Sequence, residues 1–416
     1  MKRRPRSTAS VLARRLDELG KVSEVAHGLT RTYLSPAMDE ANALVGGWMR
    51  EAGLVVREDD AGNLMGRWAA EKSGAKTLLL GSHLDTVRDA GRFDGALGVV
   101  LPIVAMAELR ARGVTLPFSV EVIGFSEEEA VRFASAYIGS KAYTGRLSEK
   151  ELQSKDAQGR TLREVIEQHA GRPFRRPAGA YRANNLIGYV EVHIEQGPVL
   201  EAENLALGVV SAMASQTRGE LIFRGQAGHA GTTPMPLRRD ALAGAAEFIL
   251  MAEKFARERS PLLATVGTLQ VPAGATNVIP GQTVLSLDVR HPSDRSCRRA
   301  VSQLVKSAER IARRRGLLCE WRETMRHAAT ACSRRLTNVL ERSVRAQQGR
   351  SVTLTSGAGH DSVVMAKLTP VAMLFVRCRD GLSHHPDEYV SPKDLAMALR
   401  TMIDFIERLA ARENKS

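Results

Sequence analysis

The sequence predicts an α/β fold, in which a domain with a central mixed, largely parallel sheet flanked by helices is interrupted by an inserted α+β domain. Residues 76–125 show a buried strand, a helix and a second buried strand, the order that forms a right-handed crossover between parallel strands. The pattern changes after Gly208 to that of a compact ββα-type unit, and α/β alternation returns from about Ala331. We therefore expect a discontinuous first domain of residues 1–213 and 330–416 around an inserted domain of residues 214–329.

The first domain is expected to begin with two helices. Val11, Leu12, Leu16 and Leu19 share one helix face, and residues 41–48 form a second amphipathic stretch. Apolar runs that end in polar residues predict the remaining elements, which are strands at 76–83, 117–125 and 186–194, a helix at 95–109 and a closing helix near 395–409.

The inserted domain is expected to combine an antiparallel sheet with two helices. Its elements are strands at 219–225, 262–271 and 283–291, a helix at about 238–256 and a helix through Val301, Leu304, Val305, Ala308 and Ile311. A length of about 115 residues is ordinary for a domain.

The chain is basic, with 59 lysines and arginines against 46 acidic residues and a formal net charge of +13 among 416 residues. A basic surface can bind nucleic acid through its phosphates, but these residues are spread along the chain and only 5% of residues are aromatic. A solvated surface is the preferred interpretation, and we expect neither nucleic acid nor a membrane as a partner. The four cysteines form no CxxC pair, and no apolar stretch follows the basic residues 2–6, which together favour a cytoplasmic protein.

Histidines and carboxylates gather at the ends of the predicted strands. His83 ends the strand 76–83, and we expect Asp85 on the same face, where its carboxylate can hold the far ring nitrogen of His83. The further candidates in polar segments are Asp94, Glu127, Glu128, Glu129, His193, His384 and His385.

Each of these motifs alone is more often structural, because a lone histidine is usually hydrogen-bonded in the core and a glutamate triplet usually begins a solvated helix. A triplet at a buried strand end is different, since three like charges there require nearby cations. Ligands of open parallel sheets also bind at the carboxyl ends of the strands. Mixed histidine and carboxylate ligands suit zinc, manganese, nickel or cobalt, so the set predicts a metal hydrolase.

Eight segments occur in an order that strengthens this prediction: GSHLDTVRDAGRFDGALGVV, SEEEAVRF, VHIEQGPVLE, GQAGHAGTTPM, TNVIPG, DVRHP, SGAGHDS and GLSHHPDE. Their order resembles that in the amidase/carbamoylase branch of the dinuclear metallopeptidase superfamily, which includes allantoate amidohydrolase, N-carbamoyl-L-amino-acid hydrolase and β-ureidopropionase. The resemblance covers nearly the whole chain. It implies a two-metal site in the α/β domain and an inserted lid domain that also forms a homodimer.

The resemblance implies two divalent metal ions per subunit, Mn2+ or Zn2+ with Ni2+ or Co2+ as alternatives. Asp94 would bridge the two ions, with His83 and His193 completing one site and Glu129 and His384 the other. Glu128 would be the general base, although Ala130 stands where the family has glycine. His360 and Asp361 are given no chemical step, and Asp361 is expected to be a helix N-cap.

The same resemblance assigns the substrate-binding residues. Arg290 would clamp a substrate carboxylate, while His229 and Asn277 would bind the ureido oxygen and steady the tetrahedral intermediate. Gln196 would contact the ureido group. The family draws His229 from the partner subunit or from closure of the lid, which makes His229 a second candidate catalytic residue.

The expected reaction is hydrolysis of a ureido C–N bond with release of ammonia and CO2. The segment LTRTYLSPAMDEANALVGGWMREAGL resembles that of bacterial allantoate amidohydrolases. Allantoate carries a carboxylate and two ureido groups but no apolar side chain, and we expect it to be converted to ureidoglycine. The alternative substrates are N-carbamoyl-L-amino acids or the substrate of β-ureidopropionase. A dinuclear aminopeptidase or aminoacylase is disfavoured by His193, since the peptidases carry a carboxylate there, and a metal-free binding protein is a further alternative.

Overall fold

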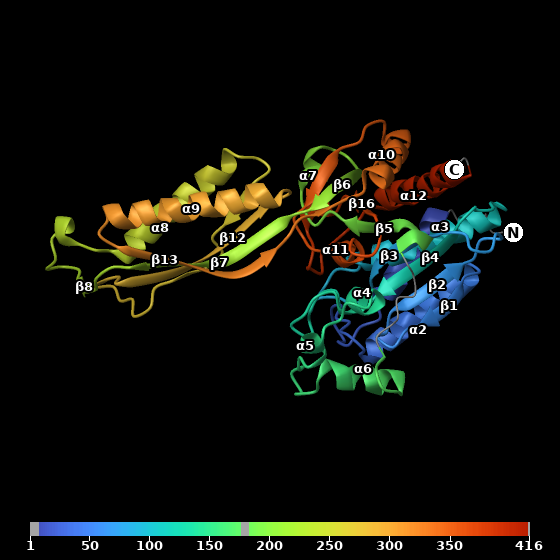
Figure 1. Cartoon of the computed structure of the whole chain (residues 1–416), viewed down its shortest axis with the longest axis horizontal. Helices are drawn as coiled ribbons and strands as arrows, with labels where there is room; N and C mark the ends of the chain where they lie inside the picture. Colours follow the sequence, from blue (N-terminus) through green and yellow to red (C-terminus); the bar gives the residue numbers. More distant parts are fainter. Residues whose placement is uncertain (1–7, 176–182, 415–416) are drawn as a thin grey trace. The chain divides into compact units, whose positions relative to one another are not determined.

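The computed structural model describes residues 8–175 and 183–414, which form two compact units (Figure 1). Unit 1 consists of Met1–Ser211 and Ala331–Ser416, and unit 2 of Ala212–Thr330. The basic residues 2–6 lie outside the described residues. Within the described part of the chain, no helix combines the length and apolar character needed to cross a bilayer.

Unit 1 is built on a mixed nine-stranded sheet with a parallel centre, which confirms the predicted fold class. Its strands are β1 (Val55–Glu58), β2 (Leu64–Trp68), β3 (Thr77–His83), β4 (Ser119–Phe125), β5 (Leu186–Ile194), β6 (Leu207–Met213), β14 (Thr330–Ala331), β15 (Thr353–Ser356) and β16 (Val371–Val376). They lie in the order β1-β2-β4-β3-β5-β16-β6-β14, with β15 paired to β6. The strands β4, β3, β5 and β16 are parallel, whereas β2 and β6 run antiparallel to their neighbours β4 and β16.

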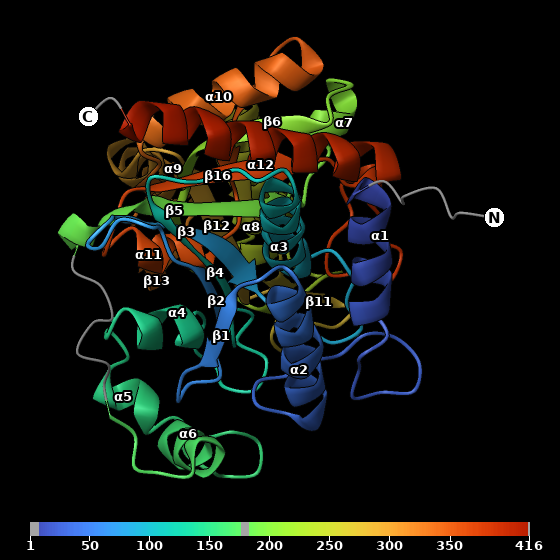
Figure 2. The same ribbon diagram turned by 90° about the vertical axis from the view of Figure 1, so that its right-hand side faces the viewer.

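Helices cover both faces of this sheet (Figure 2). One layer contains α1 (Thr8–Leu19), α2 (Pro36–Glu51), α3 (Ala96–Ala111), α10 (Arg334–Gln348) and α12 (Pro392–Glu413). On the other face, α11 (Asp361–Met365) contacts β5, β16 and α4 (Ile138–Tyr143). The shorter elements are α5 (Glu149–Leu152), α6 (Leu162–Ala170), α7 (Val199–Ala202) and the 3-10 turns η1 (Ala183–Asn185) and η3 (Arg379–Gly381). Helix α3 is buried on nearly all sides because it packs between β3 and the helices α1 and α12, which explains its continuous apolar sequence.

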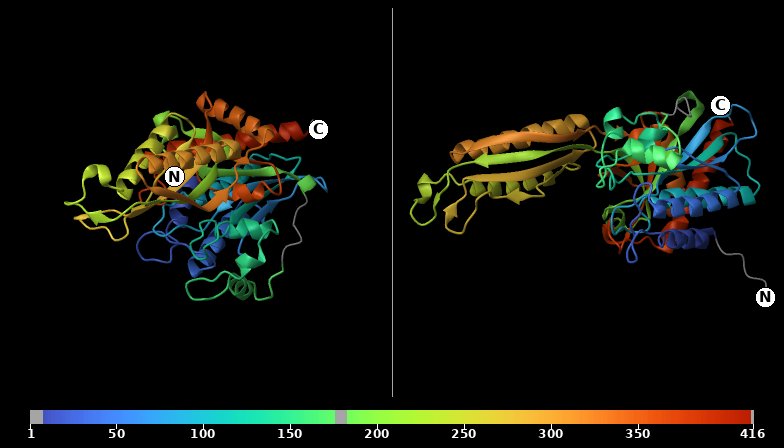
Figure 3. Two further views of the ribbon diagram at one scale, coloured as in Figure 1. Left: turned by 60° about the vertical axis from the view of Figure 1, so that its left-hand side comes forward. Right: turned by 90° about the horizontal axis from the view of Figure 1, so that it is seen from below.

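Unit 2 is an antiparallel sheet with two helices, α8 (Ala241–Arg257) and α9 (Asp294–Arg314), on one face (Figure 3). Its five-stranded sheet contains β7 (Ser215–Arg224), β9 (Leu263–Thr265), β10 (Leu269–Gln270), β12 (Gln282–His291) and β13 (Leu318–His327), in the order β10-β12-β7-β13 with β9 paired to β12. A separate ribbon joins β8 (Gly228–His229) to β11 (Val278–Ile279), and η2 (Met235–Leu237) follows β8. Every second side chain of β12 is buried, and Leu285, Leu287 and Val289 pack into the core with α8 and α9.

Two details of unit 2 differ from the sequence-based expectation. The predicted strand 262–271 is two short strands, because the hydroxyl of Ser286 accepts hydrogen bonds from the backbone N–H groups of Gly267 and Thr268 between them. Strand β13 was not predicted, because its exposed, strongly charged side chains give no apolar pattern.

Candidate metal centre

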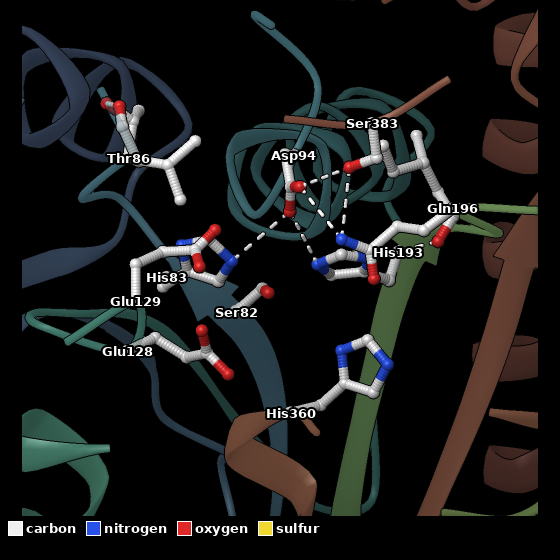
Figure 4. A network of polar contacts seen from close by, with 12 residues as sticks. Ser82, His83, Thr86, Asp94, Glu128, Glu129, His193, Gln196, His360 and Ser383 are labelled. Carbon is white, nitrogen blue, oxygen red and sulfur yellow. Dashed lines mark hydrogen bonds and ion pairs between the residues drawn. The ribbon is translucent and has the colours of Figure 1, made fainter. Parts of the chain in front are cut away.

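Three neighbouring strands of unit 1 end at one polar cluster. His83 is the last residue of β3, His193 lies near the end of the adjacent parallel strand β5, and Glu128 and Glu129 follow β4. Asp94 lies in the loop before α3 (Figure 4). The sheet topology therefore gathers side chains that are more than 100 residues apart in the sequence.

The five predicted metal ligands lie together in this cluster. Together with Glu128 they form three overlapping sets, and within each set the ligand atoms lie within 4.8 Å of one another: His83, Asp94 and His193; His83, Glu128 and Glu129; and Asp94, Glu129 and His384. Oδ1 of Asp94 is 3.0 Å from Nε2 of His193 and 3.4 Å from Nε2 of His83. Nε2 of His384 is 3.4 Å from both Oδ2 of Asp94 and Oε1 of Glu129. Asp94 thus belongs to two of the sets, as a bridging ligand would.

Backbone carbonyls orient the two buried histidines. Nδ1 of His83 is 2.9 Å from the carbonyl oxygen of Asp85, and Nδ1 of His193 is 2.9 Å from that of Ile194. An imidazole that donates a hydrogen bond from Nδ1 presents a lone pair at Nε2. In each of the two short contacts with Asp94, a ring nitrogen and a carboxylate oxygen that are both acceptors therefore face each other. Oδ1 of Asp94 is buried and accepts no hydrogen bond among the described residues. A cation between these acceptors satisfies all of them, so the residues fit a divalent metal.

The carboxylate of Asp85 has a different partner from the one expected. Its Oδ1 lies 3.8 Å from Nδ1 of His83, because His83 is the last residue of β3 and the alternation of faces stops there. The two carboxylate oxygens instead accept hydrogen bonds from the backbone N–H groups of Glu128 and Glu129, each at 3.1 Å. Asp85 therefore fixes the turn that presents the two glutamates.

The local backbone is adapted to this packing. Gly95 has a φ of +65°, and a Cβ atom there would lie 2.4 Å from the imidazole ring of His83. Ala130, which replaces the family's glycine, adopts a φ of 57°. The first of these positions requires glycine on both steric and conformational grounds.

The charged groups of the cluster strongly affect one another. Burial disfavours ionisation of Asp94, but His193 and the other imidazoles hold the pKa of its carboxyl well below its usual range. Hydrogen bonds to Asp94 and Glu129 raise the pKa of His384 to about 10. Burial raises the pKa of Glu128 well above its usual range. The cluster therefore contains acids and bases with pKa values pushed apart, which is typical of catalytic sites.

Gln196 and Ser383 contact the second oxygen of Asp94. Nε2 of Gln196 donates to Oδ2 of Asp94 at 3.0 Å and to Oγ of Ser383 at 3.0 Å, and that hydroxyl donates to the same Oδ2 at 2.7 Å (Figure 4). Gln196, which the family resemblance assigned to the ureido group, therefore lies in the cluster. Ser383 was missed, although it directly precedes the predicted ligand His384.

Two buried glutamates hold the loops of the cluster: Glu127, a candidate that was given no role, and Glu388, which was not among the candidates. Oε1 of Glu388 accepts hydrogen bonds from the backbone N–H groups of Phe93 and Asp94, at 2.8 and 3.1 Å. Oε1 of Glu127 accepts from those of Arg132 and Phe133, at 2.8 and 2.7 Å. Burial raises the pKa of Glu388 to about 7 and that of Glu127 to about 8. Glu388 is the last residue of the motif GLSHHPDE, and this position was the signal from which it could have been found.

His360 and Asp361 lie beside the cluster. The ring of His360 is 4.5 Å from that of His193 between centroids, and its Nε2 lies 2.8 Å from Oγ of Ser356. The expectation that Asp361 caps α11 is wrong, because Asp361 is the first residue of the helix and His360 occupies the cap position. Burial raises the pKa of Asp361 well above its usual range, and the nearby Glu191 adds to this effect.

The predicted substrate-binding residues His229, Asn277 and Arg290 belong to unit 2. Both His229 and Asn277 are exposed at the β8–β11 ribbon, where the backbone N–H of Ala230 donates to the carbonyl of Asn277. Nδ1 of His229 accepts a hydrogen bond from the N–H of Gly231 at 3.0 Å. A ring that accepts at Nδ1 carries its proton on Nε2, which makes that nitrogen a donor.

Arg290 lies on β12 and is held by Asp288 of the same strand. Its Nε and Nη2 donate to the two oxygens of Asp288 at 3.0 and 2.9 Å. Arg218 and Gln216 of β7 donate to the same carboxylate at 2.8 and 2.7 Å. Although burial opposes it, the hydrogen bond from Arg290 lowers the pKa of Asp288. The guanidinium of Arg290 is therefore fixed in orientation by a fully ionised partner.

The chain is similar to known proteins over most of its length. The profile of peptidase family M20/M25/M40 matches residues 79–408. A protein of Oryza sativa subsp. japonica named probable allantoate deiminase is 41% identical over 431 residues, which cover 95% of this chain and 87% of that protein. The N-carbamoyl-L-amino acid amidohydrolase of Geobacillus stearothermophilus is 37% identical over 97% of this chain and 98% of its own. A solved amidase of the hydantoinase/carbamoylase family from Burkholderia multivorans has a TM-score of 0.89 and 32% identity, with 96% of this chain and 97% of that one covered.

Proposed function

The chain belongs to peptidase family M20/M25/M40, among the amidohydrolases that cleave C–N bonds other than peptide bonds, and from this premise we propose that it hydrolyses a ureido bond of allantoate. The products are ureidoglycine, ammonia and CO2. The observation that carries the proposal is the cluster of histidines and carboxylates around Asp94, in which opposed acceptor atoms require cations and Glu128 lies alongside.

We propose that this cluster holds two divalent cations, Mn2+ or Zn2+, through His83, Asp94, Glu129, His193 and His384. Such ions, when bound, act as Lewis acids and acidify water. The carboxylate of Glu128 accepts the proton of the attacking water and donates it to the leaving nitrogen. The summed charge of two +2 ions exceeds the negative charge of Asp94, Glu128 and Glu129 by about one unit. The resulting positive charge of the site favours an anionic substrate.

Unit 2 supplies the groups that bind the substrate in this proposal. Arg290 pairs with the substrate carboxylate, and Asp288 keeps its guanidinium in place. His229 donates from Nε2 to the oxygen that becomes negative in the tetrahedral intermediate, and the side chain of Asn277 assists.

Two features support allantoate as the substrate. The relative named probable allantoate deiminase shares 41% of its aligned residues with this chain, against 37% for the N-carbamoyl-L-amino acid amidohydrolase. The groups assigned to substrate binding are all polar, which suits a molecule without an apolar side chain. The alternative, an N-carbamoyl-L-amino acid, is favoured by a relative of nearly equal length, since that match covers 97% of this chain and 98% of the relative.

Steady-state rates with metal-loaded enzyme test the proposal. We expect kcat/KM for allantoate to exceed those for N-carbamoyl-L-alanine and a simple dipeptide at least about tenfold, a difference of about 1.4 kcal/mol in transition-state binding. A tenfold preference for N-carbamoyl-L-alanine would make the carbamoylase reaction the function, and a preference for the dipeptide would reject both. The variant Glu128→Gln should keep its metal by elemental analysis while losing about 10²–10⁴-fold in kcat.

We also propose a homodimer formed through unit 2, in which His229 acts at the centre of the partner subunit. The β8–β11 ribbon that carries His229 lies at the end of unit 2 remote from the residues where the chain enters and leaves it, which supports this assignment (Figure 1). Mixing the inactive variants Glu128→Gln and His229→Ala under exchange conditions should then restore about a quarter of the wild-type activity, because half of the dimers carry one complete site. If each centre used its own His229, the mixture would stay inactive.

A further inference from the structure

A groove between α8 and α9 of unit 2 carries positive charge that the proposed reaction does not use. Its volume of about 750 Å³ lies in the range of ligand pockets. The two helices lie side by side on one face of the sheet, and both line the groove (Figure 3). Its cationic side chains are Lys254, Arg259, Lys306, Arg310 and Arg313.

These cations are only partly neutralised. The groove contains two carboxylates, Glu258 and Glu309, so five cations leave a formal net charge of +3. Lys254 and Arg259 share one partner, since Nζ of Lys254 and Nη1 of Arg259 lie 3.9 and 3.5 Å from the carboxylate oxygens of Glu258. Among the described residues, no carboxylate forms an ion pair with Lys306, Arg310 or Arg313. Three cations in the groove are thus available to an external anion.

The unpaired charge is greater here than in two other hollows of the described residues. One of them has three arginines against Glu24 in its lining, a formal charge of +2, but two of these, Arg132 and Arg160, pair with Asp156. The hollow beside His169 balances Arg50 and Arg57 against Asp39 and Glu58. On α9 itself, the neighbouring Arg314 pairs with Glu247 of α8. Carboxylates therefore offset more of the positive charge at these places than in the groove between α8 and α9.

Three of the cations lie in a row along one face of α9. Lys306, Arg310 and Arg313 are spaced i, i+4 and i+7, so they share one face over about 10 Å of helix axis. The opposite face is anchored in the core by Leu304 and Ile311. Nη2 of Arg310 donates to the hydroxyl of Ser307 at 2.8 Å, which places another polar group in the groove.

An anion that matches this row must carry several charges within a short length. A single carboxylate engages one of the three cations, whereas linked phosphates engage all of them and accept hydrogen bonds from Ser307 and Gln303. The ring of Phe255 already stacks against Arg259 at 4.0 Å, so it offers no open pair of faces for the intercalated bases of a nucleic acid strand. We propose that the groove binds an oligophosphate anion, either the di- or triphosphate of a nucleotide or free pyrophosphate or tripolyphosphate.

Calorimetric titration of the full-length protein with tripolyphosphate and with ATP tests this proposal. The double variant Lys306→Ala/Arg313→Ala should weaken binding at least about tenfold. A matched double variant, Arg295→Ala/Arg298→Ala, removes the same charge from the same helix outside the groove and should change Kd less than about threefold. Circular dichroism of both variants checks that the helix is intact.

The two ligands distinguish the sources of the phosphate chain. ATP binding about tenfold tighter than tripolyphosphate supports a nucleotide site, and similar values support a site for free oligophosphate. Equal weakening of binding in both double variants would show diffuse electrostatic attraction and overturn the proposal. Absence of binding to the wild-type protein would also overturn it. So would binding that persists in the groove variant, because the ligand would then occupy the metal centre. Tighter binding of a single-stranded oligonucleotide that depends on Arg295 and Arg298 would also reject it and indicate nucleic acid instead.

Discussion

Asp94 in unit 1 and Asp288 in unit 2 are both surrounded by nitrogen atoms, but of different chemistry. Asp94 is buried and faces three imidazoles at 3.0 to 3.4 Å. Asp288 is partly exposed and accepts hydrogen bonds from two guanidinium groups and one amide at 2.7 to 3.0 Å. Guanidinium is always charged and always a donor, so the surroundings of Asp288 are complete, whereas an imidazole lone pair facing a carboxylate requires a shared cation. Unit 1 is therefore built to take up a cofactor and unit 2 to keep an arginine in place.

The largest effect is expected at Asp94. Asp94→Asn removes the charge that the imidazoles face, and we expect loss of bound metal together with a fall in kcat/KM of at least about 10³-fold, since metal polarisation supplies several kcal/mol. Elemental analysis and steady-state kinetics measure both. Asp89→Asn, at an exposed position in the same loop, is the matched control and should behave as wild type. Full metal content in Asp94→Asn would contradict the bridging role.

Glu388 tests how the loop of Asp94 is held. Glu388→Ala leaves the backbone N–H groups of Phe93 and Asp94 without their acceptor, and we expect about 10–100-fold weaker metal binding, as for other groups that orient ligands. Glu388→Gln retains an oxygen acceptor and should recover most of that loss. Metal titration followed by activity or fluorescence distinguishes the two variants. Equal defects in both would mean that the charge, rather than the acceptor atom, matters.

A smaller and different effect is expected at Asp288. Asp288→Asn weakens the hold on Arg290, and we expect KM for an anionic substrate to rise about tenfold with metal content and kcat nearly unchanged. Glu320→Gln is a matched control, because Glu320 also accepts a hydrogen bond from an arginine two residues later in the same sheet. If kcat fell instead of KM rising, Asp288 would not act through substrate binding.

The smallest effect concerns His169, an imidazole outside both of these carboxylate clusters, which lies near Glu58 and Asp39. Nε2 of His169 is 2.7 Å from Oε1 of Glu58, and this hydrogen bond raises the pKa of His169. The protonated pair therefore stabilises the fold fully below the unfolded pKa of about 6.5, and the stabilisation is lost as pH rises through the folded pKa. We expect His169→Asn to lower Tm at pH 5.5 by the equivalent of about 0.5 kcal/mol and to have less effect at pH 8.5. The exposed His27→Asn serves as control, and a defect independent of pH would contradict the assignment.

Much of the fold and of the metal cluster could be predicted from sequence, because both depend on apolar strands that end in chemically distinctive residues. The five candidate ligands lie together as a result of strand order, and four of them stand at or near strand ends or in the loop that follows. The partner of His83 could not be predicted, because the chain leaves the sheet at that residue and the backbone of Asp85, rather than its carboxylate, meets the ring.

The roles of two glutamates that accept hydrogen bonds from backbone N–H groups were not predicted either. Glu388 and Glu127 each accept two backbone hydrogen bonds, and this role depends on the path of a loop. Both residues stand in quoted motifs, but a motif does not tell which backbone N–H groups a side chain meets. Asp288 was passed over for a different reason, since its partners are side chains, and its pairing with Arg290 at i and i+2 of one strand became evident only with the distances.

The position of β16 in the sheet has a consequence for biosynthesis. This strand lies between β5 and β6 but is translated after the whole of unit 2, and His384 follows it. During translation, the edges of β5 and β6 that will pair with β16 therefore stay unpaired while unit 2 is synthesised. Unpaired apolar strand edges promote aggregation of nascent chains. Metal capture is accordingly a late event, because the ribosome must release the last segment before the ligand set exists.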